Sequence, residues 1–146
     1  MTAASPRNAN NRIICSGILT IGSQQTVRGA GQLGANTIGI INLGTVKASR
    51  ANNELRIDAN ASQFENRCTV KALGAGGLRS IGDFVQSEGQ TVVNSTMTLQ
   101  SGNLRLMGGS LSGDGMINGS VNNTGGTVNV GNSPGTLTID GDYSQT

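Results

Sequence analysis

The sequence contains no histidine and no tryptophan, only two phenylalanines and one tyrosine, and 12% charged residues. The absence of histidine excludes catalytic arrangements that need an imidazole, such as a Ser-His-Asp triad. The scarcity of aromatic rings argues against a compact core built around large side chains. We therefore expect a thin interior of Val, Ile, Leu, Ala and Met that repeats along an axis.

Proline and cysteine are also rare. Pro6 and Pro134 are the only prolines, so nearly all strand residues can donate a backbone hydrogen bond. Cys15 and Cys68 lie more than two coils apart in a stacked structure, which is beyond the reach of a disulfide. We expect two free thiols that act as small apolar fillers. Without histidine or a CxxC pair we expect no metal site, and we also expect no cofactor.

Long apolar stretches are missing as well. No segment approaches the roughly 18 apolar residues of a membrane-spanning helix. Residues 1–11 are small and polar and lack the apolar region of a secretory signal. We expect them to form a flexible leader or a partial cap, followed by a single domain over residues 12–146. We interpret that domain as a fragment of a longer rod.

Glycine, in contrast, accounts for 23 of the 146 residues and interrupts short apolar segments along the chain. Such segments alternate apolar and polar residues, as half-buried strands do. Each is too short to form a core unless it stacks on copies of itself. INLGTVKA at residues 41–48 is repeated as ENRCTVKA at residues 65–72. The repeats predict a core ladder formed by Val46, Val70, Val92 and Val128.

The spacing of these valines predicts the fold. A repeat of about 22 to 24 residues fits one circuit of a right-handed parallel β-helix with three short strands per coil. We therefore predict an all-β fold, a right-handed parallel β-helix (β-solenoid) of about 5–6 coils. The step from Val92 to Val128 is longer than one coil, which indicates an inserted or irregular coil.

Asparagines recur near the expected corners of the coils. Their side chains can hydrogen-bond along the axis when they stack, as in cross-β ladders. They can equally be present only because asparagine suits tight turns. Both interpretations stay open for Asn42, Asn66, Asn94 and Asn122 or Asn123.

The end of the chain carries a family resemblance. Residues 125–146, GGTVNVGNSPGTLTIDGDYSQT, resemble the passenger-associated strand repeat of bacterial autotransporters and related surface proteins. The most specific part is GNSPGTLTIDGDYSQ, and LSGDGMINGSVNNTGG extends the likeness to residues 111–146. Residues 27–110 resemble the family only in their general sequence character, without a specific motif. This sequence shows no signal, no barrel and no rung after Tyr143, so the resemblance predicts the local fold rather than the export route.

The resemblance implies rungs of a right-handed β-helix that is exported across the bacterial envelope. It therefore implies an extracellular or cell-surface location. It also implies a turn shaped by Gly131, Pro134 and Gly135, and two further core residues, Leu137 and Ile139.

The charge distribution is uneven. Residues 1–71 carry eight basic and three acidic side chains, whereas residues 72–146 carry two and five. We interpret this as a solvated surface, because a nucleic-acid face needs clustered Lys and Arg with stacking aromatics. We expect neither a nucleic acid nor a membrane span for this segment.

Few residues suggest catalysis. Asp83 and Glu88 could share a face, as the two carboxylates of a glycosidase do, but a turn residue and a solvated strand end explain them better. We expect no enzyme, and predict a structural stalk or spacer of a bacterial surface or secreted protein. The alternative is an adhesin or glycan-binding module that contacts a surface through Thr, Asn and Ser. A third hypothesis is a degenerate carbohydrate-active β-helix.

The partners follow from the same interpretation. Coils at the ends of the stack expose unpaired backbone groups, so we expect end-to-end self-association. A surface glycan or a protein is the ligand that the adhesin alternative would require.

Overall fold

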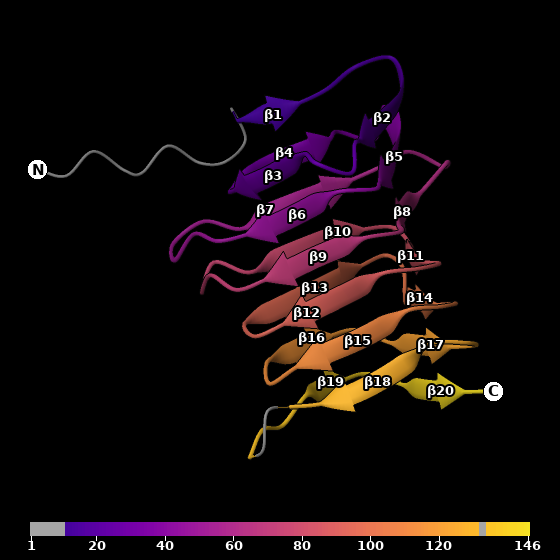
Figure 1. Cartoon of the computed structure of the whole chain (residues 1–146). Helices are drawn as coiled ribbons and strands as arrows, with labels where there is room; N and C mark the ends of the chain where they lie inside the picture. Colours follow the sequence, from indigo (N-terminus) through magenta and orange to yellow (C-terminus); the bar gives the residue numbers. More distant parts are fainter. Residues whose placement is uncertain (1–10, 132–133) are drawn as a thin grey trace, which may run out of the picture.

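The structure is a computed structural model that describes residues 11–131 and 134–146. In these ranges the chain forms short strands joined by turns, with no helix. Figure 1 shows the strands stacked in coils along one axis, from the N-terminal to the C-terminal end. Each full coil contributes one strand to each of three parallel sheets, named here sheets A, B and C.

The described strands are divided among the three sheets as follows. Sheet A contains β1 (Arg12–Ile13), β4 (Gly31–Gly34), β7 (Leu55–Asp58), β10 (Leu78–Ile81), β13 (Thr96–Gln100), β16 (Met116–Asn118) and β19 (Thr138–Asp140). Sheet B contains β2 (Gly17–Ile21), β5 (Ile38–Asn42), β8 (Phe64–Asn66), β11 (Phe84–Gln86), β14 (Leu104–Leu106), β17 (Val121–Asn123) and β20 (Tyr143–Gln145). Sheet C contains β3 (Thr26–Gly29), β6 (Thr45–Ala48), β9 (Thr69–Ala72), β12 (Gln90–Val93), β15 (Ser110–Gly113) and β18 (Thr127–Val130).

Every strand pairs in parallel with the strand three places before or after it in the chain. This topology confirms the predicted all-β parallel solenoid, with about six coils in the described residues. The expected leader at residues 1–11 lies outside the described residues except for Asn11.

The core consists of columns of inward side chains, one residue per coil. Because side chains alternate along a strand, every second residue points inward and stacks on its register partner. The Phe64 and Phe84 rings stack in this way on β8 and β11, with centroids 4.8 Å apart. Larger fully buried members are Leu33, Ile38, Ile40, Ile57, Phe64, Leu78, Phe84, Met97, Leu104, Leu106, Leu111 and Ile117.

The register of sheet C corrects the predicted valine ladder. Val46 pairs with Val70, and both are fully buried. The next residue in the column is Thr91, whereas Val92 pairs with Lys71 on the outer face. The prediction for Val92 is therefore wrong. A threonine can occupy this inward position because its hydroxyl donates a hydrogen bond of 2.5 Å to buried Gln86 Oε1.

The long step between Val92 and Val128 is two coils rather than an irregular one. Leu111 on β15 pairs with Thr91 on one side and with Val128 on the other. Leu111 is fully buried, and Val128 packs partly buried against the core. Thr91 and Leu111 are 20 positions apart, and Leu111 and Val128 are 17 apart, whereas Val46 and Val70 are 24 apart. The coils in this part of the chain are therefore shorter.

The two cysteines do not fill the core as expected. Both are free, Cys15 is exposed in the turn between β1 and β2, and Cys68 is half-buried in the turn before β9. The prediction of small apolar fillers is wrong because both residues lie in turns between strands, where side chains are not enclosed by three sheets.

Glycine is needed where one corner lies directly on the corner of the preceding coil. A Cβ atom on Gly44 would lie 2.3 Å from the carbonyl oxygen of Gly22 and 2.4 Å from that of Gln25. Gly22, in the preceding coil, has room for a side chain, since its Cβ would approach only Gln25 Cγ at 3.6 Å. Neither glycine has a positive φ, so the two differ in steric space alone.

We predict that Gly44→Ala lowers the free energy of unfolding by about 1–3 kcal/mol, because the added methyl group forces two corners apart. Gly22→Ala is the matched control and should change it by less than about 0.5 kcal/mol. Urea denaturation followed by far-UV circular dichroism measures both. Equal effects of the two substitutions would contradict the close coil-to-coil contact at Gly44.

Candidate functional site

The residues singled out at the C-terminal end form a corner and part of the core. Gly131 has φ +63°, and the Gly135 backbone passes so close that a Cβ on Gly131 would lie 2.6 Å from Gly135 Cα. Pro134 is exposed, and Asn132 and Ser133 lie outside the described residues. Residues 137 and 139 complete this coil: Leu137 is buried and Ile139 packs partly buried against the core.

The two carboxylates considered for catalysis are not brought together. Asp83 directly precedes β11, and its Oδ1 accepts a hydrogen bond from the backbone N–H of Asn103 (3.0 Å). Glu88 is exposed in the turn after the same strand, so a strand of about 10 Å separates them. In the described part of the chain, no group of three His, Cys, Asp or Glu side chains could hold a metal ion.

A ladder of buried amides runs along the corner between sheets B and C. Asn42 Nδ2 donates to Asn66 Oδ1 (2.8 Å), and Asn66 Nδ2 donates to Gln86 Oε1 (3.3 Å). The three residues end β5, β8 and β11 and are fully buried. Their remaining polar atoms bind the backbone of the following turns, for example Gly44 N–H to Asn42 Oδ1 (3.1 Å). The ladder therefore fixes both the register and the path of each corner.

This ladder distinguishes, for some of the corner asparagines, between stacking along the axis and a role in the turn alone. Stacking along the axis is confirmed for Asn42 and Asn66, but Asn94 and Asn122 are exposed. Asn123 is buried and holds its own turn by accepting from the backbone N–H of Gly126 (2.8 Å). Sequence reasoning missed Gln86, whose position two residues after Phe84 matches that of Asn66 after Phe64.

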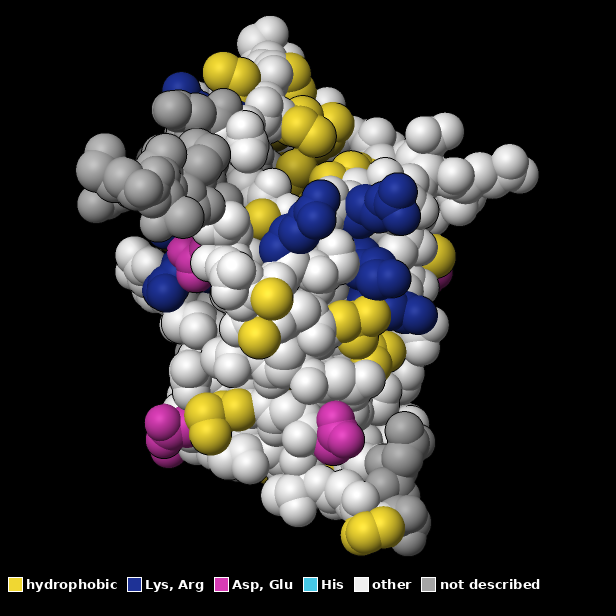
Figure 2. Space-filling view, turned by 90° about the vertical axis from the view of Figure 1, so that its left-hand side faces the viewer, with side chains coloured by type: hydrophobic (Ala, Val, Ile, Leu, Met, Phe, Trp, Pro, Cys, Tyr) yellow, Lys and Arg dark blue, Asp and Glu magenta, His cyan; other side chains and the backbone are white. Residues whose placement is uncertain are grey.

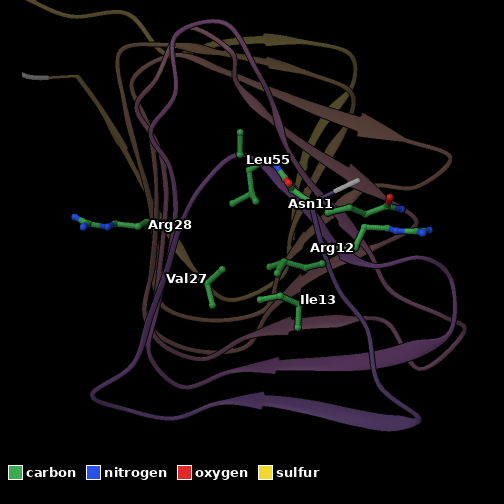
Figure 3. Close-up of a pocket in the computed structure, with 9 residues that line it drawn as sticks. Asn11, Arg12, Ile13, Val27, Arg28 and Leu55 are labelled. Carbon is green, nitrogen blue, oxygen red and sulfur yellow. The ribbon is translucent and has the colours of Figure 1, made fainter. Parts of the chain in front are cut away.

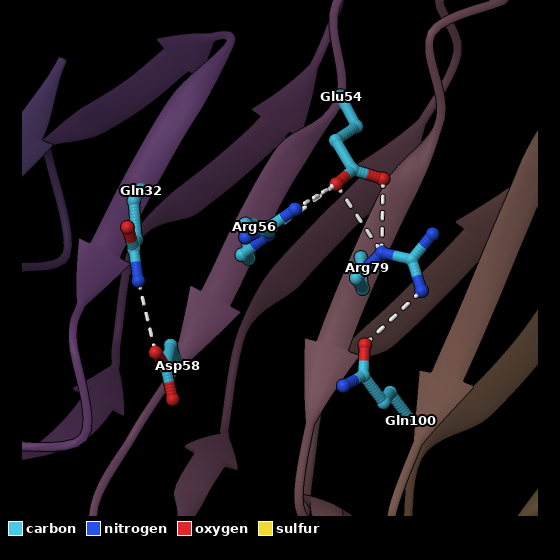
Figure 4. A network of polar contacts seen from close by, with 6 residues as sticks. All are labelled: Gln32, Glu54, Arg56, Asp58, Arg79 and Gln100. Atoms are coloured by element: carbon cyan, nitrogen blue, oxygen red, sulfur yellow. Dashed lines mark hydrogen bonds and ion pairs between the residues drawn. The ribbon is translucent and has the colours of Figure 1, made fainter. Parts of the chain in front are cut away.

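The outer face of sheet A carries a charged network (Figure 4). Arg56 and Arg79 occupy paired positions on β7 and β10. Glu54 accepts from Arg56 Nη2 (2.7 Å) and from Arg79 Nε (3.0 Å), so one carboxylate bridges two stacked guanidinium groups. Arg79 Nη1 also donates to Gln100 Oε1 (3.2 Å), one coil further on.

The arginines change the titration of Glu54. Partial burial raises the pKa of Glu54, but the hydrogen bonds and positive charges of Arg56 and Arg79 outweigh burial and hold this pKa below its ordinary value of 4.5. The carboxylate is thus more stable in the folded chain than in the unfolded chain.

The outer face of sheet C carries cations of a different kind. Arg28, Lys47 and Lys71 occupy register-paired positions on β3, β6 and β9. None of the three forms an ion pair with a carboxylate of the described residues. Figure 2 shows Lys and Arg side chains gathered toward the N-terminal end of the face in view, with acidic side chains at its left edge and toward its C-terminal end.

A second column lies beside these cations. Thr26, Thr45 and Thr69 begin the same three strands and are paired with one another. They lie two residues before the cations, so both sets point to the outer face. At the end of β6 the turn adds a hollow of about 330 Å³ lined by Arg28, Gly29, Ser49 and Arg50.

A different hollow of about 210 Å³ lies inside the first coils (Figure 3). Its walls include the inward side chains Val27, Leu33 and Leu55. Arg12 and Gln32 line it as well, so it is a half-open hollow beside the core with polar as well as apolar walls. In the same view Arg28 points away from the coils, whereas its neighbour Val27 points into them.

We predict that Asn66→Ala lowers the free energy of unfolding by at least about 2 kcal/mol, because buried partners of the amide lose their hydrogen bonds. These include Asn42 Nδ2 and Gln86 Oε1. The exposed Asn94→Ala is the control, with a change within about 0.5 kcal/mol. Urea denaturation at neutral pH measures both, and a loss at residue 66 no larger than at residue 94 contradicts the structural role of the ladder.

The lowered pKa of Glu54 makes stability depend on pH. Its contribution is fully present above the unfolded-state pKa near 4.5 and is lost as the pH falls through the lower folded-state pKa. We predict that Glu54→Gln unfolds at a lower temperature than the unchanged protein at pH 7, and that the difference shrinks on acidification below 4.5. Thermal unfolding between pH 7 and pH 3 measures this. The control is Asp114→Asn, an exposed carboxylate; a constant difference for Glu54→Gln across the range would refute the ion-pair explanation.

The described ranges contain no helix of the length and apolarity that a membrane crossing requires. Comparisons with models of known protein families, with curated proteins and with solved structures found no match for this chain. The likeness of residues 111–146 to the passenger-associated strand repeat therefore rests on their sequence pattern.

Proposed function

We propose that this chain is a segment of a β-solenoid rod that acts as a non-enzymatic stalk or spacer in a bacterial surface or secreted protein. The observation that carries the proposal is the uninterrupted pairing of three parallel sheets along one axis. A structure of this kind has length and stiffness, and it holds whatever is attached to one end at a fixed distance from the other.

The coil contacts explain how such a segment resists bending and stretching. Each boundary between full coils joins strands in all three sheets, so separating two coils breaks several backbone hydrogen bonds together. The amide ladder from Asn42 to Gln86 adds side-chain bonds along the same axis. Because these bonds lie inside the corner, water does not readily replace them.

The location follows from the autotransporter-like pattern. Residues 111–146 span the last coils, from within β15 to β20, and each of these strands pairs with the equivalent strand of a neighbouring coil. This arrangement supports the interpretation of the segment as repeating rungs, and with it an exported protein at the cell surface. End-to-end association of copies stays a prediction, based on end strands that pair on one side only among the described strands.

A non-enzymatic role is supported by the hydrogen-bond and ion-pair partners of the polar side chains. Asp83 binds a backbone N–H, Glu54 binds two arginines, and the buried amides bind the backbone and one another. These groups hold corners and faces in place, which is the work that a stalk requires of them.

Immunolabelling of the bacterium that makes this protein tests the location. We predict that antibodies to the purified chain label intact cells, and that brief protease treatment of the cells from outside removes the label. Antibodies to a cytoplasmic protein should label permeabilised cells only. A signal from this chain that requires permeabilisation, and that external protease does not reduce, would refute the proposal.

A further inference from the structure

The cations of sheet C, which form no ion pair within the described residues, make up a column with a fixed spacing. Neighbouring strands in a sheet lie about 4.8 Å apart, and the register places Arg28, Lys47 and Lys71 directly above one another. The column ends at the fourth coil, where Val92 is the partner of Lys71. The positive charge on the outer face of sheet C is therefore confined to the first three coils.

Such a column is unfavourable unless something neutralises it. Like charges placed opposite each other on neighbouring strands destabilise a sheet. Sheet A has the same arrangement at Arg56 and Arg79, and there Glu54 bridges the two guanidinium groups. Sheet C has no such described carboxylate. An anion that neutralises the sheet C column would therefore come from outside the chain.

The surroundings of the column suit a ligand with hydroxyl groups as well as negative charges. The threonine column runs parallel to the cations on the same face. A threonine hydroxyl both donates and accepts, as sugar hydroxyls do. The hollow lined by Arg28 and Arg50 adds a place for one anionic group, since guanidinium groups bind carboxylates and other oxyanions in bidentate fashion.

We infer that this face binds a linear acidic polysaccharide that lies along the axis of the solenoid, with its anionic groups on the Arg28, Lys47 and Lys71 column. The spacing of the coils is close to the length of one pyranose unit, so successive sugars can meet successive strands. Their hydroxyl groups face the column of Thr26, Thr45 and Thr69.

Other polymers fit this face less well. A single-stranded nucleic acid is normally held by aromatic rings that stack on its bases, and the outward positions of β3, β6 and β9 carry threonine, arginine and lysine only. A neutral glycan would leave the cations without a partner. An acidic polysaccharide satisfies both columns, and it would make the rod adhesive as well as supporting.

A binding experiment on the whole chain tests the inference. The probe is a fluorescein-labelled heparin oligosaccharide, a sulfated uronate polymer, followed by fluorescence anisotropy at about 0.15 M salt, where weak surface attraction is largely screened. Lys47→Gln should weaken binding about tenfold, the effect of one charged hydrogen bond. Arg105→Gln is the matched control, because Arg105 is an exposed cation on sheet B and its loss changes the net charge equally.

Further variants and probes separate the alternatives. Lys47→Arg should keep the affinity within about twofold, and Lys47→Gln should reduce the salt dependence by roughly one counterion. Labelled poly(dT) should bind at least about tenfold more weakly than heparin, because this face offers its bases nothing to stack on. Thermal unfolding monitored by circular dichroism confirms that each variant is folded.

Three results would overturn the inference. The first is no binding of heparin by the unchanged chain. The second is an equal loss of affinity in Arg105→Gln and Lys47→Gln, which would indicate diffuse attraction rather than the column. The third is poly(dT) binding as tight as heparin binding and equally sensitive to Lys47→Gln, which would indicate a nucleic acid. All three leave the stalk proposal intact, since that proposal rests on the coil contacts and is tested separately by immunolabelling.

Discussion

The structure depends on backbone pairing between each coil and the next. A strand such as β9 has little apolar surface of its own, and it is held by β6 on one side and β12 on the other. Because all pairing is parallel and in register, each residue is placed above its equivalent in the preceding coil. Val70 rests on Val46, Asn66 on Asn42 and Lys71 on Lys47. The same geometry therefore decides the packing of the core, the corners and the charge of the surface.

The columns differ in how much they gain from this repetition. Stacked valines or phenylalanines lose water and gain contacts, so repetition stabilises the core. Stacked amides also gain, because the donor of Asn42 meets the acceptor of Asn66. Stacked cations lower the stability of the stack, since their repulsion is not compensated inside the sheet. Where the chain repeats an unfavourable column, as at Lys47 and Lys71, stability of the stack does not explain the repetition.

Much of the fold could be predicted from the sequence, because TVKA repeats after 24 residues and glycine or asparagine stands at the corners. The register could not be fixed where two valines adjoin: in QTVV, alternation permits either Val92 or Val93 inward. The choice depends on Gln86, which offers an acceptor to the hydroxyl of Thr91. The charged column was also not predicted. Arg28, Lys47 and Lys71 are 19 and 24 positions apart, and only the register shows that they share one line.

A supporting rod and a binding face are compatible in this architecture. A flexible chain that binds a polymer must first order its own backbone, and it loses affinity in doing so. Here the backbone of Lys47 and Lys71 is already fixed by the pairing of β6 and β9. The rigidity that suits a stalk therefore also preorganises a row of cations. Because the sheet C cations lie only in the first coils, the two ends of this face differ, so an acidic polymer would contact one part of the rod and leave the rest free.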